Sequence, residues 1–146
     1  MTEVDFYILG ANTQSEEKLA FTCRLVEKIY RLDRKVHIHT TSPSESARLD
    51  DLLWTYRDST FLPHGIVGHT ATAQSPISIG HSEDFGKIND VLINLTDEVP
   101  SFFSQFLRLS ELVSGDESAK SAARKRFSFY KTRGYPLKTH NLENDG

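Results

Sequence analysis

The chain has 146 residues, which is long enough for one domain with a hydrophobic core of its own. Hydrophobic residues make up 38% of it and charged residues 25%, an ordinary balance for a soluble globular protein. The single cysteine excludes an internal disulfide, and no apolar run approaches the length of about 18 residues that a membrane span needs. Because the first five residues are acidic rather than basic, we expect no targeting signal, no membrane contact and a cytoplasmic protein.

The net charge of -3 hides a strong asymmetry along the chain. The segment 118–138 contains no Asp or Glu but 7 of the 17 basic residues, namely Lys120, Arg124, Lys125, Arg126, Lys131, Arg133 and Lys138. A solvated helix face usually carries charges of both signs. This segment therefore predicts an acidic partner, which is either a nucleic-acid backbone or an acidic peptide.

The first elements in chain order are a buried strand over 4–9, a turn over 10–14 and a helix that starts at Ser15. Apolar residues recur along this helix at spacings of four, three and four, at Leu19, Cys23, Val26 and Tyr30. The pattern places Cys23 on the packed face, where we expect a reduced, buried thiol. A short alternating strand follows over 35–40.

The start of a helix is predicted by Ser42, Pro43 and Glu45. Serine suits the N-cap, proline suits the first helical position, and glutamate three residues after the cap completes a capping box. The helix is predicted to run to about Trp54.

Small and polar residues over 65–76 predict a long loop at the start of the second half. The sequence predicts no single conformation for the region 65–89 as a whole. A short strand is a candidate over 77–79, and 91–95 is the clearest buried strand of this half.

The remaining elements are a short helix over 100–106, an alternating strand over 107–113 and a last helix over 118–133. Gly134 stands where a glycine ends a helix. The polar residues beyond Leu137 predict a frayed tail.

Strands that alternate with helices predict an α/β fold, here a three-layer Rossmann-like sandwich with a mostly parallel sheet flanked by helices. The basic helix lies at its C-terminal end. We expect a single domain over 1–138 and a polar C-terminal tail over 139–146.

Catalytic and cofactor motifs are weak. The turn 10–14 has one glycine where a dinucleotide site has several, and no P-loop occurs, so we predict no catalytic site and no cofactor. His37 and His39 point to the same face of a strand, but no third ligand accompanies them, so we favour ordinary packed histidines over a metal site. His64 is expected to be a structural hydrogen-bonding residue at the end of a loop.

Two stretches favour binding instead. The segment 49–64 places large apolar side chains on a helix end and a loop, which either hold that loop to the body or present a surface to a partner. On the last helix, Arg124, Phe127, Ser128 and Lys131 recur at three- and four-residue intervals. They either bind an anionic peptide or single-stranded nucleic acid, or else Phe127 and Tyr130 pack inward beneath solvated charges.

The order of several short motifs resembles the chi subunit family of bacterial DNA polymerase III. The specific part is Leu-Asp-Asp-Leu-Leu-Trp at 49–54 followed by Ser-Thr-Phe-Leu-Pro-His at 59–64. Weaker support comes from the segments 6–9, 23–28, 35–39, 90–95 and 123–135.

This resemblance implies an accessory subunit of the clamp-loader assembly that has no catalysis of its own. Its partners would be the psi subunit, in a heterodimer, and the acidic C-terminal tail of single-stranded DNA-binding protein. Single-stranded DNA would be contacted indirectly, and some members also join a helicase-like protein through the psi surface. A direct single-stranded nucleic-acid-binding module and a nucleotide-dependent α/β enzyme are the alternatives.

The resemblance also implies two sites. The psi-facing surface maps to Trp54, Phe61, Leu62 and Pro63. The tail pocket maps to Val113, Lys120, Arg124, Phe127 and Ser128. Arg124 would pair with the terminal carboxylate of the tail, while Val113 and Phe127 would receive its aromatic side chain. The family tends to have tyrosine at 127 and lysine at 128, so a weaker or differently salt-sensitive tail site is expected here.

Overall fold

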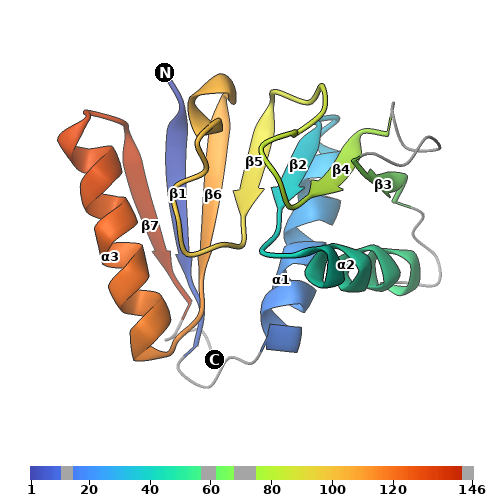
Figure 1. Cartoon of the computed structure of the whole chain (residues 1–146), viewed down its shortest axis with the longest axis horizontal. Helices are drawn as coiled ribbons and strands as arrows, with labels where there is room; N and C mark the ends of the chain where they lie inside the picture. The colour runs from blue at the N-terminus through green and yellow to red at the C-terminus, as the bar shows by residue number, and fades with distance from the viewer. Residues whose placement is uncertain (11–14, 57–61, 68–74, 143–146) are drawn as a thin grey trace.

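The computed structural model describes residues 1–10, 15–56, 62–67 and 75–142. Its elements in chain order are β1 (Glu3–Ile8), α1 (Ser15–Arg31), β2 (Val36–His39), α2 (Pro43–Thr55), β3 (His64–Ile66), β4 (Ile77–Gly80), β5 (Val91–Asn94), the 3-10 turn η2 (Phe103–Gln105), β6 (Arg108–Val113), α3 (Glu117–Thr132) and β7 (Leu137–Asn141). The strands within these ranges form one sheet in the order β3-β4-β2-β5-β6-β1-β7, and every paired strand is parallel to its neighbour (Figure 1).

The handedness of the crossovers explains which helix covers which face. From β1 through α1 to β2, and from β2 through α2 to β3, the chain steps along the sheet in one direction; from β6 through α3 to β7 it steps in the other. Right-handed connections that step in opposite directions must lie on opposite faces. Accordingly, α1 and α2 pack into one hydrophobic cluster and α3 into the other, which confirms the predicted three-layer α/β sandwich.

Alternation along the strands divides the core between the two faces. Val91 and Ile93 pack with the α1 and α2 cluster, whereas Leu92 between them packs with the α3 cluster. The α3 side is rich in aromatic rings, because the segment around η2 brings Phe102, Phe103 and Phe106 against Tyr130 and its neighbours.

A buried polar network joins α3 to the middle of the sheet. Glu111 of β6 has no exposed surface, and its carboxylate accepts hydrogen bonds from Arg126 Nε at 3.1 Å, Tyr130 Oη at 2.5 Å and Asn94 Nδ2 at 2.8 Å. Burial raises the pKa of Glu111, and the positive charge of Arg126 opposes that shift, followed by the hydrogen bonds from Tyr130, Asn94 and Arg126. One guanidinium and two neutral donors thus contact the buried carboxylate, and a buried ion pair needs such additional hydrogen bonds.

Several predicted elements are confirmed in detail. Ser42 caps α2 by accepting from Glu45 N, and Pro43 is the first helical residue. The Glu45 carboxylate reaches back one residue further than a capping box requires, to Thr41 N at 2.8 Å. Gly134 follows α3 with a positive φ of 80°, a conformation that glycine adopts without strain.

Two predictions were wrong, both at the edges of the sheet. The predicted loop 65–76 begins within β3, a three-residue strand hydrogen-bonded to β4. Residues 139–141 of the predicted tail belong instead to β7, which pairs with β1 through Asn141, and residues 143–146 lie outside the described ranges. An edge strand leaves side chains in solvent, so its polar sequence carries little of the alternation that marks a strand. Within the described ranges, no helix is long and apolar enough to cross a membrane.

The network makes a testable prediction about stability. Replacing Arg126 with Met should lower the free energy of unfolding by about 3 kcal/mol, because it leaves the Glu111 carboxylate buried without its cation. Arg124→Met, two residues away and 67% exposed at the side chain, is the matched control and should change it by less than about 0.5 kcal/mol. Urea denaturation of both variants checks this, and equal small effects would show that the ion pair does not hold α3 in place.

Candidate functional site: an apolar pocket with a cationic rim

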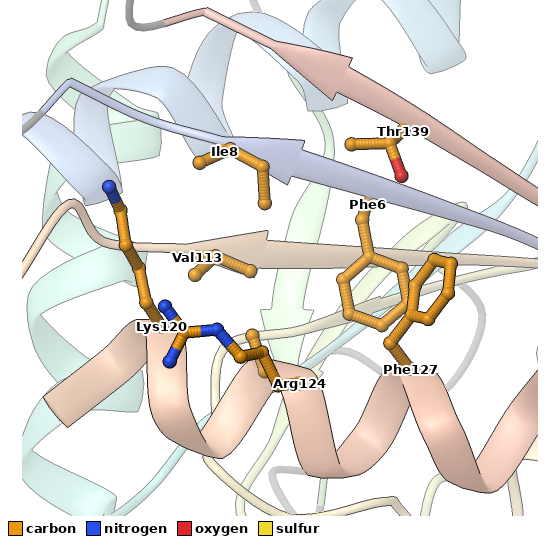
Figure 2. A pocket seen from close by; sticks show the side chains of 8 residues that line it. Phe6, Ile8, Val113, Lys120, Arg124, Phe127 and Thr139 are labelled. Carbon is orange, nitrogen blue, oxygen red and sulfur yellow. The ribbon is translucent and has the colours of Figure 1, made fainter. Parts of the chain in front are cut away.

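A cavity of about 260 Å³ lies between α3 and the three strands at one edge of the sheet. Figure 2 shows its side chains converging from four elements. The lining residues are Phe6 and Ile8 of β1, Val113 of β6, Thr139 of β7, and Lys120, Ala123, Arg124 and Phe127 of α3. The strands supply an apolar floor, and the helix supplies one wall.

The aromatic end of the pocket is a pair of phenylalanines. The ring centroids of Phe6 and Phe127 lie 5.4 Å apart at an interplanar angle of 60°. Phe6 is buried, whereas Phe127 is half-buried and so belongs to both the core and the pocket wall. Val113, 1% exposed, completes the floor. A third aromatic ring inserted here would meet ring edges and methyl groups, a favourable environment for it.

The cationic end of the pocket is formed by Lys120 and Arg124, one helical turn apart (Figure 2). The Arg124 guanidinium is 67% exposed at the side chain and lies 3.8 Å from the exposed carboxylate of Glu117. A surface ion pair of this kind contributes little, so a ligand carboxylate can displace it. The arrangement therefore suits a ligand that has a carboxylate and an apolar ring close together.

Four of the five residues predicted for this pocket come together in it, namely Val113, Lys120, Arg124 and Phe127. Ser128 is exposed and does not line the cavity. The sequence did not predict the other four lining residues, Phe6, Ile8, Ala123 and Thr139. The alternation of Phe6 and Ile8 on one face was visible in the sequence, but only the sheet order shows that this face adjoins α3.

The residues predicted for a second surface separate into exposed and buried members. Trp54, in the last turn of α2, is 52% exposed, and its ring lies 4.3 Å from the His64 ring. Leu62 is 1% exposed and belongs to the α1 and α2 core, so its side chain fastens the segment rather than facing a partner. Pro63 is half-buried, and Phe61 lies outside the described residues.

His64 has the structural role predicted for it. Its ring nitrogens lie 2.5 Å from the Leu62 carbonyl oxygen and 3.1 Å from the Asp50 carbonyl oxygen, and its side chain is fully buried. The imidazole thus joins α2 to the start of β3, and its ring lies beside the Trp54 ring.

His37 and His39 lie on one face of β2, as predicted, and both contact the Phe102 ring. His37 Nδ1 is 2.7 Å from Ser78 Oγ, and burial lowers the pKa of His37 to about 3. Among the residues that the structure describes, no group of three His, Cys, Asp or Glu is placed to hold a metal ion.

A second cavity, of about 530 Å³, lies at the carboxyl edge of β2 and β5, where doubly wound sheets bind nucleotides. Its lining includes the carboxylates of Glu83, Asp97 and Glu98 and no Lys or Arg. These charges repel phosphate, and the nearby Thr41 N–H at the start of α2 already donates to Glu45. The geometry therefore favours the apolar pocket as the functional site.

Comparison with known proteins shows the family of the chain. A family profile described as "DNA polymerase III chi subunit, HolC" matches residues 1–138. The chain is 39% identical to DNA polymerase III subunit chi of Pseudomonas aeruginosa over 142 residues, which cover 97% of this chain and 98% of that protein. Identity to the subunit of the same name from Haemophilus influenzae is 34%, covering 94% of this chain and 95% of that one.

A more distant likeness shows the fold alone. The solved structure of T4 UvsW matches with a TM-score of 0.66 at 10% sequence identity, covering 97% of this chain and 42% of that protein.

The buried His37 makes stability depend on pH. Its folded pKa of about 3 lies below the ordinary 6.5, so the unfolded chain takes up a proton that the folded chain does not. Its stabilising contribution is complete above pH 6.5 and should fall by about 1.4 kcal/mol per pH unit as the pH drops toward 3. Denaturation at several pH values should show a shallower fall for His37→Gln than for wild type, with the exposed His81→Gln as control. Parallel curves for wild type and His37→Gln would contradict this.

Proposed function

Because the chain belongs to the DNA polymerase III chi subunit family, we propose that it is a non-catalytic bridge within that polymerase complex. One surface binds the psi subunit of the clamp loader, and the other binds the acidic C-terminal tail of single-stranded DNA-binding protein. The observation that carries the proposal is the apolar pocket with a cationic rim, since a C-terminal aromatic residue has the matching chemistry.

In the pocket, the two recognised groups of the ligand, its carboxylate and its aromatic ring, bind at different positions along α3. The terminal carboxylate pairs with Arg124 and Lys120 at one end, and the aromatic side chain enters between Val113, Phe6 and Phe127 at the other. The apolar floor also excludes water from one side of the ion pair, which strengthens it relative to a fully solvated pair.

Phenylalanine at 127 keeps the apolar wall, because its ring packs on Phe6 without needing a hydroxyl group. Serine at 128 lies outside the cavity, so its lack of charge affects the approach of an acidic chain rather than the pocket itself. We therefore propose a functional tail site that depends less on salt than a site with a further lysine.

For the psi surface, the support is the exposed indole of Trp54. A large aromatic side chain that remains half exposed on a helix end is typical of an interface anchor. The buried side chains of Leu62 and His64 anchor residues 62–64 to the core and to α2, beside Trp54.

A second candidate function is direct binding of single-stranded nucleic acid by α3, which the unmixed basic charge of residues 118–138 favours. It differs from the first in needing no C-terminal carboxylate. A tail peptide with an amidated C-terminus would lose binding only if the carboxylate is recognised.

Removing the Arg124 guanidinium should weaken tail binding strongly. We expect Arg124→Ala to reduce the affinity for the last ten or so residues of the organism's single-stranded DNA-binding protein by about tenfold to about a hundredfold, as for a lost charge-assisted hydrogen bond. Calorimetric titration measures this. Lys138→Ala, which also removes one cation, is the control. An unchanged affinity for Arg124→Ala would remove the tail pocket from the proposal.

Truncating Trp54 should act on the other partner. We expect Trp54→Ala to weaken binding of the psi subunit by more than about tenfold, because anchor residues dominate interfaces, and to leave tail-peptide affinity unchanged. Leu107→Ala removes a similarly exposed apolar side chain, 64% exposed, from the residue before β6 and should affect neither partner. Undiminished psi binding by Trp54→Ala would contradict the assignment.

A further inference from the structure

We propose that the acidic residues upstream of the tail's last residue follow α3 toward its C-terminal end and bind at Lys131. This inference rests on the proposed tail pocket and adds a second subsite to it, together with a direction for the bound peptide. Lys131 is not among the residues that line the pocket.

The phase of the helix places Lys131 in line with the pocket. At about 100° per residue, Lys120, Arg124, Phe127 and Lys131 all lie within a sector of about 60° around the α3 axis. Lys125 lies at least about 100° from any of them by the same count, and Ser128 lies about 60° from Lys131. Lys131 therefore continues the stripe of side chains that borders the cavity, whereas the equally exposed Lys125 leaves it.

The orientation of the carboxylate sets the direction of the chain. Figure 2 shows Lys120 and Arg124 toward the N-terminal end of α3, with the Phe6 and Phe127 rings further along it. The carboxylate and the amide nitrogen leave the Cα atom of a terminal residue on different sides. A carboxylate that points to the start of α3 leaves the direction of its end open to the preceding residues, and we assign them that direction.

Charge supports the same direction. At the start of α3, Asp116 and Glu117 are exposed and repel an acidic chain. From Ser118 to Lys138 there is no carboxylate. Two other nearby cations do not face the pocket side of α3. The Arg133 guanidinium lies 3.6 Å over the Phe129 ring. Lys138 pairs in register with Asp5, whose side chain contacts His140 on the face of the sheet away from α3.

The spacing selects a position in the peptide. Arg124 and Lys131 are seven residues apart, or about 10 Å along a helix that rises about 1.5 Å per residue. An extended peptide covers this in about three residues. Lys131 therefore pairs with an acidic side chain about three residues before the C-terminal one, and it supplies the upstream charge that Ser128 does not.

A double-mutant cycle tests this with the full chain. The probe is a synthetic peptide that ends in phenylalanine with a free carboxylate and has one aspartate three residues before it, in an otherwise uncharged sequence. Its partner peptide has asparagine in place of aspartate. Each is titrated against wild type, Lys131→Ala, Lys125→Ala and Arg124→Ala at low salt.

We expect Lys131→Ala to weaken the aspartate peptide about threefold to about tenfold and to leave the asparagine peptide unchanged, a coupling typical of a partly exposed ion pair. Lys125→Ala should show no such coupling. Equal effects of Lys131→Ala on both peptides, or coupling at Lys125 instead, would overturn the subsite. In that case a loss of affinity with Arg124→Ala would still support the tail pocket. If Arg124→Ala has no effect, or the peptide does not bind, the proposed function fails and this inference fails with it.

Discussion

The carboxylate of Glu111 is the constraint on which the proposed binding face of α3 depends. It lies fully buried in the middle of β6, and its three donors come from β5 and α3. On its side of the sheet α3 is the only described α-helix, and the segment around η2 packs against it. Breaking a buried ion pair costs more than forming it gains, so the pair specifies where α3 can lie. Arg126 faces inward to this network, and Arg124 and Phe127 beside it consequently face the pocket.

The order of the strands separates the two proposed binding surfaces. α2 and β3, with Trp54 and His64, lie toward one edge of the sheet, and β7 with the pocket lies at the other (Figure 1). The strands between them are buried and continuously hydrogen-bonded, so the scaffold is expected to be rigid. A rigid scaffold with two distant sites suits a subunit that holds two partners at once, and it needs no conformational change to do so.

Elements whose physical cause is local can be predicted from local patterns in the sequence. The cap and first proline of α2 and the apolar run of β5 are local signals, and the structure confirms both. The pocket residues of α3 followed from helical spacing and the family resemblance. β3, β7 and Thr139 were missed because an edge strand is defined by its neighbour, which is distant in sequence. Whether Leu62 faced outward or inward was undecidable from an apolar residue type alone, and packing in the α1 and α2 cluster decided it.

We propose that the two surfaces act independently on one scaffold. Sedimentation of the chain with psi and with single-stranded DNA-binding protein, separately and together, measures this independence. Independent surfaces predict a complex that contains all three proteins, with an affinity for the tail that is the same in the presence and absence of psi. Displacement of psi by the tail, or of the tail by psi, would contradict the account, because it would place both partners on one surface.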